Sequence, residues 1–160
     1  MDLTADELAG VVDLFGGLTR AELGRGLAEL AFKGGEDVDP TVFADDIDAA
    51  LASYHLVAVD PDGTGADVAD PLLVPGPVAF PELPPGATDL PHIMDVAERP
   101  VDSEAAAAAA QRRFQREAAT AVDEDDVARI ASLLDVSYEL EAWGSVDLST
   151  ARERLDDATE

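Results

Sequence analysis

A proline-rich segment divides the chain and limits how it can fold. Eight of the ten prolines lie between residues 71 and 100. Proline has no backbone N–H and a fixed φ, so it denies this segment the hydrogen bonding of both a helix and a central strand. It also carries apolar side chains, such as Phe80 and Leu90, whose exposure to water is unfavourable. We therefore predict a strap, residues 76–100, that lies extended on the surface and ties two helical parts together; the alternative is a loose linker.

The chain before this segment begins with two strong helix-start signals. Thr4 and Glu7 have the spacing of a capping box, in which a hydroxyl and a carboxylate each accept a hydrogen bond from an otherwise unpaired N–H. Thr19 and Glu22 repeat the spacing. Apolar residues follow both boxes at helical intervals, which predicts two helices. We expect these helices to end at the glycine pairs, residues 16–17 and 34–35.

A third helix and a β-hairpin complete the first part. Asp39-Pro40 predicts an N-cap followed by proline in the first helical position, and the apolar spacing continues to residue 54. Residues 55–59 and 72–74 are predicted strands, joined by the turn-rich segment 60–65. Three helices, a strand, a polar loop and a strand is the order of a winged helix, and it also suits any small helical domain with a hairpin.

The last part, residues 101–160, is predicted to be helical throughout. Ser103 can cap a long helix that contains the alanine run 105–110 and continues to about Thr120, because alanine has the highest helix propensity. A second helix follows from Val127, and Asp147 or Ser149 can cap a third. The predicted fold is mainly α with a small β-hairpin. A winged-helix-like half, residues 1–75, packs with this C-terminal helical part, as separate domains or as one compact unit.

The charge of the chain is strongly negative. There are 35 Asp and Glu residues against 10 Lys and Arg, a net charge of −25, and Lys33 is the only lysine. In ordinary buffer such a charge destabilises the compact state, whereas in molar salt the screening length falls to about 3 Å. A disordered acidic chain does not fit a hydrophobic content of 47%. We therefore predict a halophilic protein that works in a cytoplasm of high salt concentration.

Several classes of protein are disfavoured by the sequence. The chain has no cysteine, which excludes disulfides and thiolate sites. No secretion signal is visible at the N-terminus and no stretch approaches the roughly 20 apolar residues of a membrane span, so we expect no membrane partner. No nucleophile elbow, phosphate-binding loop or dinucleotide pattern is present, so we predict neither an enzyme nor a cofactor.

A weak metal-binding pattern surrounds one histidine. Asp89, His92 and Asp95 are three residues apart and could surround a divalent cation. Pro91 argues against a regular helix through all three, and one imidazole is a weak signal. We interpret His92 as a hydrogen-bonded surface residue, assign no metal, and interpret His55 as structural.

The predicted third helix is acidic where a DNA-binding winged helix is basic. It contains Asp45, Asp46 and Asp48 and no Lys or Arg, and the candidate wing, residues 60–70, has four Asp and no base. Phosphate contacts would be repulsive on both elements. If the fold is a winged helix, we therefore expect this face to bind protein or nothing at all.

Basic residues gather at one place only. Arg112 and Arg116 share a helix face because they are four residues apart. One interpretation is a docking patch for phosphate or an acidic partner; the other is charge balance, since Arg113 precedes Glu117 by four residues. The candidate interaction residues are Arg99, Arg112, Arg113, Phe114, Arg116 and Trp143.

Three stretches carry a resemblance to a known family. They are Leu3–Leu8, Leu73–Pro81 and Asp89–Asp95, and they resemble a family of uncharacterised proteins from halophilic archaea over nearly the whole chain. The resemblance implies a salt-rich cytoplasm, and it implies no catalytic or binding residue because the family has no established activity. The helix order of residues 1–75 is similar to that of winged-helix regulators, except that the basic face is missing.

These observations leave three functional hypotheses. The first is a non-enzymatic protein-interaction or regulatory module that binds another protein or itself. The second is a DNA-binding transcription regulator that uses Arg99, Arg112, Arg113 and Arg116 in place of the third helix. The third is an enzyme with a carboxylate site around His92. Convergence of the arginines on one exposed patch would favour the second, and a pocket holding His92 with carboxylates would favour the third.

Overall fold

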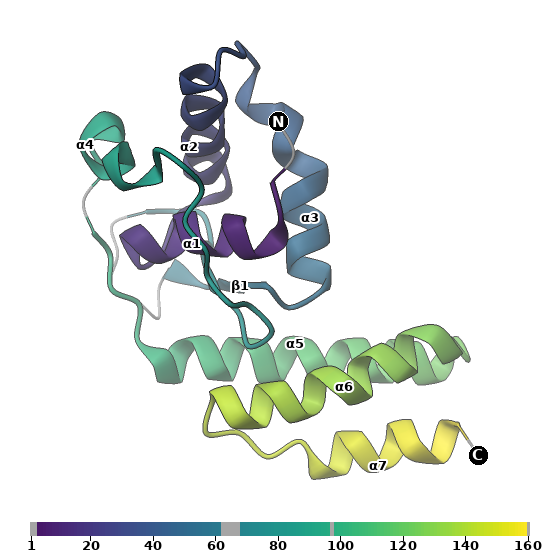
Figure 1. Cartoon of the computed structure of the whole chain (residues 1–160). Coiled ribbons are helices and arrows are strands. Elements are labelled where there is room, and N and C mark those ends of the chain that lie inside the picture. The colour runs from purple at the N-terminus through teal and green to yellow at the C-terminus, as the bar shows by residue number, and fades with distance from the viewer. Residues whose placement is uncertain (1–2, 62–67, 97, 160) are drawn as a thin grey trace.

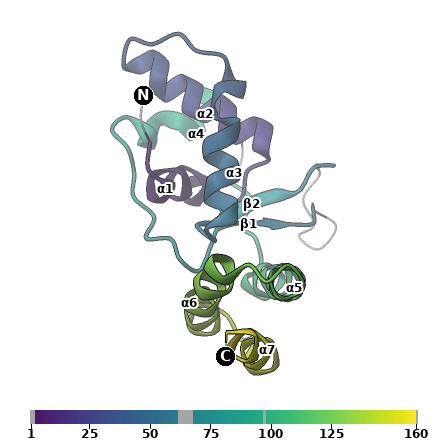
Figure 2. The ribbon, with the colours of Figure 1, turned by 90° about the vertical axis from the view of Figure 1, so that its right-hand side faces the viewer.

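The protein is mainly helical with one small antiparallel sheet, as the sequence predicts. The computed structural model describes residues 3–61, 68–96 and 98–159. The N-terminal helices lie on one side of the hairpin, and the three C-terminal helices lie on the other (Figures 1 and 2). The α-helices of the described residues are α1 (Ala5–Phe15), α2 (Arg20–Lys33), α3 (Ala44–Ala52), α4 (Leu90–Met94), α5 (Ser103–Asp123), α6 (Val127–Trp143) and α7 (Ser149–Ala158).

Both predicted capping boxes are confirmed. The Thr4 hydroxyl accepts from the Glu7 N–H and the Glu7 carboxylate accepts from the Thr4 N–H, each at 3.0 Å. The second box, at Thr19 and Glu22, has distances of 3.2 and 2.9 Å. Helix α1 ends at Gly16, whose φ of +84° favours glycine.

The third helix begins with a tighter turn. Asp39 accepts from the Thr41 N–H and caps a 3-10 turn, Pro40–Phe43, that leads directly into α3. The two predicted strands are β1 (Leu56–Val59) and β2 (Leu72–Pro75), which pair antiparallel. Part of the predicted loop and wing, residues 62–67, lies outside the described residues.

A third backbone segment joins the sheet. Leu18, between α1 and α2, forms an isolated antiparallel bridge with Leu73 of β2, with N···O distances of 3.1 and 2.7 Å. The bridge fixes the link between α1 and α2 against the hairpin, so these two helices and the sheet form one packed unit.

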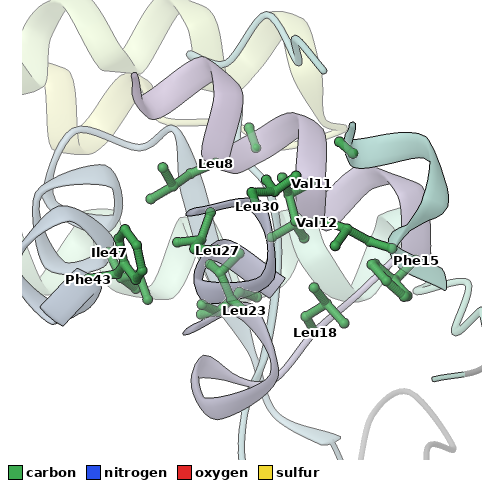
Figure 3. Close-up of a cluster of buried hydrophobic side chains, with 14 of the residues drawn as sticks. Leu8, Val11, Val12, Phe15, Leu18, Leu23, Leu27, Leu30, Phe43 and Ile47 are labelled. Atoms are coloured by element: carbon green, nitrogen blue, oxygen red, sulfur yellow. The ribbon is translucent and has the colours of Figure 1, made fainter. Parts of the chain in front are cut away.

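Buried apolar side chains form two clusters. The first lies among α1, α2 and α3 and is centred on residues such as Phe15, Leu27 and Ile47 (Figure 3). It also takes in Leu90 of α4, which shows that α4 packs with the N-terminal helices. The second cluster joins the outer side of the hairpin to α5, α6 and α7, and its largest members are Tyr54 and Phe114. The hairpin therefore contributes to both clusters and lies between them (Figure 2).

The prediction of a strap extended along its whole length is wrong in one part. Residues 87–89 form a 3-10 turn and α4 follows immediately. Pro91 lies in the first turn of α4, where its missing N–H leaves no hydrogen bond unmade. The part of the strap before this turn runs from β2 past α1 (Figure 1) and is tied to it, because the Phe80 and Glu82 N–H groups both donate to Asp6 at 3.0 Å.

The C-terminal helices differ from the predicted ones at their ends. Asp102 caps α5 in place of Ser103, and α5 extends three residues beyond Thr120, to Asp123. At the start of α7 the N-cap position is Leu148, so neither predicted cap is the N-cap; the Asp147 carboxylate, one residue earlier, accepts from the Ser149 N–H at 3.0 Å.

Candidate functional site

The outward face of α3 is acidic, as the sequence predicts. Ile47 and Ala50 are buried, which leaves Asp45, Asp46 and Asp48 exposed on the solvent side of the helix. One of these carboxylates, Asp48, pairs with Arg20 of α2, and both side chains remain about half exposed or more. The face is therefore an accessible surface with a negative charge.

The six candidate interaction residues lie in different settings and do not form one patch. Phe114 is fully buried in the second cluster, where it meets Tyr54 edge to face at 6.4 Å between ring centroids. Because Phe114 has no exposed surface, the prediction that it contacts a partner is wrong, and Phe114 is a core residue. Trp143, at the end of α6, is 37% exposed.

Arg99 anchors the strap to α2. Its guanidinium forms a bidentate ion pair with the Glu22 carboxylate, in which the longer N···O distance is 2.8 Å. The backbone N–H of Arg99 donates to the Phe15 carbonyl at 2.6 Å. Glu22 also closes the capping box of α2. The hydrogen bond from Arg99 is the largest cause that lowers the pKa of Glu22 to about 2, and the contacts from Thr19 act in the same direction.

Arg113 belongs to a partly buried polar cluster, which we name the Glu117 cluster: Tyr54, Arg113, Glu117 and Arg129. The Tyr54 hydroxyl donates to Glu117 at 2.8 Å, Arg113 Nε donates to the other carboxylate oxygen at 2.7 Å, and Arg129 donates from α6. The Arg113 guanidinium also lies 4.3 Å from the centre of the Tyr54 ring. Residues from three separate stretches of the chain therefore share one carboxylate.

The Glu117 cluster also caps the C-terminal end of α3. Arg113 donates to the Leu51 carbonyl, and Arg129 donates to the Ala52 carbonyl at 3.2 Å. Cations are favourable at this position because the last carbonyls of a helix lack partners and carry partial negative charge. The C-terminal end of α3 is thus held by α5 and α6, and this contact connects the two halves of the molecule.

The remaining predicted arginines stay exposed. Arg112 and Arg116 lie on the solvent side of α5, and within the described residues neither forms an ion pair. Arg154 of α7 is exposed in the same way. Arg99 and Arg113 are bound internally, so Arg112 and Arg116 alone of the predicted arginines remain available to a partner.

In the described part of the chain, neither His55 nor His92 belongs to a metal-binding group. Among the residues that the structure describes, no group of three His, Asp or Glu side chains is placed to hold a metal ion. Asp89, next to His92 in the predicted pattern, pairs with Lys33 at 3.1 Å. His55 Nδ1 lies 2.7 Å from the Ser53 hydroxyl, which agrees with a structural interpretation. Over the same described ranges, no helix is long and apolar enough to cross a membrane.

Several hollows on the described surface have the size of a binding site, and two of these lie beside Trp143 and beside α3. One, of about 560 Å³, lies between the start of α5 and the end of α6 and is lined by Glu104, Glu141 and Trp143. The other, of about 370 Å³, lies between α2 and the start of α3 and is mostly apolar. Both fall within the usual range of ligand pockets, roughly 300–1,000 Å³.

One pair of the Glu117 cluster can be predicted from the sequence. The spacing of Arg113 and Glu117 indicated their pair, which forms across one helical turn. The apolar spacing of the third helix includes Tyr54, and no local pattern connects Tyr54 or Arg129 with Glu117. Burial of a tyrosine hydroxyl requires a hydrogen-bond partner, which is the one signal that pointed toward such a contact.

Comparison with known proteins gives a family and no activity. A model described as a family of unknown function (DUF7109) matches residues 6–160. No curated protein and no solved structure matches the chain. The expectation of a family without an established activity is confirmed. Since the match runs from the first turn of α1 to residue 160, the protein belongs to this family of unknown function, DUF7109.

Proposed function

We propose that the protein is a non-enzymatic protein-interaction or regulatory module whose N-terminal half, residues 1–75, is a winged-helix-like unit. Two observations support the winged-helix-like interpretation. The elements follow in the order α1, α2, α3, β1 and β2, and the segment between α1 and α2 pairs with the hairpin through Leu18. Packing against α5 adds a second support to the hairpin. The unit then presents α3 outward as its recognition surface.

The acidic outer face of α3 is the observation that carries the proposal. A helix that reads DNA approaches phosphates, and Asp45, Asp46 and Asp48 would repel them. The same carboxylates are suited to basic or hydrogen-bonding side chains of a protein partner. The high net negative charge of −25 fits a protein that works in a cytoplasm of high salt, where such a surface is screened.

Site-specific crosslinking tests the proposal. A photo-crosslinking amino acid at Ala49, which is exposed on α3, is expected to give a discrete product with a protein in cells or in a high-salt lysate. The same group at Glu153, exposed on α7, is the position control. The purified partner should then bind the Asp45→Lys variant at least about tenfold more weakly, a loss of about 1.4 kcal/mol. The exposed Asp135→Lys variant makes the same charge change on α6 and should bind normally. Absence of any product from Ala49 would contradict the proposal.

DNA binding is the second candidate, and the exposed pair Arg112 and Arg116 favours it. Titration of a labelled duplex, followed by fluorescence anisotropy, separates the two functions. We expect no saturable binding at low or molar KCl, since the surrounding charge repels phosphate. Saturable binding that is lost in Arg112→Glu with Arg116→Glu would establish the DNA-binding function instead.

A further inference from the structure

The strap carries an apolar and acidic surface that nothing covers in the described part of the chain. Phe80 is 80% exposed and Leu83 is 47% exposed, and the exposed Glu82 lies between them in the sequence. By contrast Ala87 and Leu90, farther along the strap, are buried. Single exposed apolar residues are normal, whereas two beside a carboxylate on one short segment indicate a contact surface.

The backbone of this segment is held in place. The Phe80 and Glu82 N–H groups each donate to Asp6 of α1 at 3.0 Å. The Glu82 backbone also lies so close to Gly10 that a β-carbon there would fall 2.1 Å from the Glu82 carbonyl oxygen. Side chains presented from a fixed backbone lose less conformational entropy on binding, so this segment is prepared for a partner. On this attached segment Phe80 remains 80% exposed.

The hollow between α2 and α3 has the complementary character. Its walls include Ala21, Gly24, Pro40 and Ile47, and two arginines of α2, Arg20 and Arg25, stand beside them. Val42, which follows Thr41 of the hollow in the chain, is 55% exposed. A volume of about 370 Å³ is enough for a large apolar side chain together with part of its neighbours.

The arginines beside the hollow favour a segment that carries a carboxylate. Arg20 already pairs with Asp48, whereas Arg25 is exposed and makes one long contact, 3.4 Å, with the Met94 carbonyl. Arg25 is therefore available to a carboxylate, and Arg–carboxylate pairs are strong and directional. An apolar side chain next to a carboxylate is the combination that Phe80, Glu82 and Leu83 present.

We propose that the strap of a second copy of this chain docks in the hollow between α2 and α3, with Phe80 against the apolar walls and Glu82 paired with Arg25. Exchange of the same contact in both directions gives a closed dimer with twofold symmetry. This inference rests on the proposed interaction function and names a second copy as one partner.

Size-exclusion chromatography with light scattering in molar KCl, over a range of protein concentrations, tests the dimer. The unaltered protein is expected to dimerise, and Arg25→Glu and Glu82→Arg are each expected to weaken dimerisation at least about tenfold. The Arg25→Glu/Glu82→Arg double variant restores the pair with the charges exchanged and should recover the dimer. Phe80→Ala should weaken it as well, and Glu153→Arg on α7 is the matched charge control. All these residues are exposed, and unchanged circular dichroism will verify that each variant is folded.

The outcomes separate this inference from the proposed function. A protein that stays monomeric at every concentration overturns the dimer, and the proposed function still stands if Ala49 crosslinks to another protein. A dimer that persists in both single variants places self-association elsewhere and overturns the docking site. Failure of the double variant to recover the dimer overturns the Arg25–Glu82 pair. Failure of the Ala49 crosslink, with the dimer intact, contradicts the α3 recognition surface alone.

Discussion

The Tyr54 hydroxyl donates a 2.8 Å hydrogen bond to the Glu117 carboxylate, joining residues 63 positions apart. Burial and the nearby negative charge of Glu117 raise the pKa of Tyr54, so the donor keeps its proton throughout the neutral range. Tyr54 has a φ of +63°, which is unfavourable for a bulky residue and is maintained by its surroundings. The Glu117 cluster therefore fixes both the conformation of Tyr54 and the contact between the two halves.

Replacement of Glu117 by Gln should destabilise the protein by about 2–4 kcal/mol, because it leaves Arg113 and Arg129 partly buried without a compensating charge. Urea unfolding in molar KCl, followed by circular dichroism, will measure the loss. The exposed Glu153→Gln variant is the control and should change stability by less than about 0.5 kcal/mol. Equal stabilities of the two variants would show that the cluster does not stabilise the fold.

Tyr54→Phe keeps the ring in the core and removes only the hydroxyl. We expect a loss of about 1.5–3 kcal/mol, which is typical of hydrogen bonds to charged groups. Combination of this change with Glu117→Gln in a double-mutant cycle should give a coupling energy of at least about 0.5 kcal/mol. Additive losses would mean that the two residues stabilise the protein independently.

The pair between Glu22 and Arg99 should make stability depend on acid pH. The pKa of Glu22 falls from 4.5 to about 2 in the folded protein, chiefly because Arg99 donates to the carboxylate. A group with a lowered folded pKa stabilises the protein above its unfolded pKa and loses that contribution as pH falls through the folded value. The contribution of Glu22, up to about 3 kcal/mol, should therefore be complete above pH 5 and disappear toward pH 2.

Comparison with Glu22→Gln isolates this contribution from the other carboxylates. The unfolding free energies of the two proteins should differ most at pH 6 and converge as the pH approaches 2. Asp135→Asn, on the exposed face of α6, controls for the loss of one carboxylate and should follow the unaltered protein at each pH. A difference between Glu22→Gln and the unaltered protein that does not depend on pH would refute the linkage.

The elements that could be predicted from sequence depend on neighbours within a few residues. Thr4 and Glu7 determine a helix start by their own spacing, and Gly16 marks the end of α1 through its positive φ. Phe114 illustrates the limit of such reasoning. An aromatic residue among arginines resembles a surface contact, yet α5 is covered by the hairpin and by α6 and α7, so this position is buried.

The long-range contacts could not be predicted for a similar reason. Periodicity shows which side of a helix is apolar but does not show which other helix covers it. Arg129 reaches Glu117 only because α6 folds back along α5, and Arg99 reaches Glu22 only because the strap returns along α2. In both pairs each arginine has many carboxylates in the sequence with which it could pair. Only the folded structure shows which carboxylate lies within reach.

Gly10→Ala should displace the strap from α1. A β-carbon at this position would lie 2.1 Å from the Glu82 carbonyl oxygen, so one backbone must move. We expect destabilisation of about 1–3 kcal/mol, as for other overpacked sites, and faster proteolysis within residues 76–86. Gly34→Ala is the control, since its β-carbon would have no neighbour closer than 3.4 Å and its φ of −82° suits alanine. Equal proteolysis of the two variants would show that the strap does not depend on this contact.

Salt dependence tests the interpretation of the charge. Mutual repulsion within a net charge of −25 opposes folding most at low ionic strength, where the screening length is about 30 Å, and least at molar salt, where it is about 3 Å. Dialysis from molar KCl into low-salt buffer should therefore lower the melting temperature and reduce helical circular dichroism. Molar NaCl should restore both if screening is the cause, because screening depends on ionic strength and not on the identity of the cation. An unchanged melting temperature at low salt would show that the acidic surface does not limit stability, and the proposal of a high-salt cytoplasm would lose its physical basis.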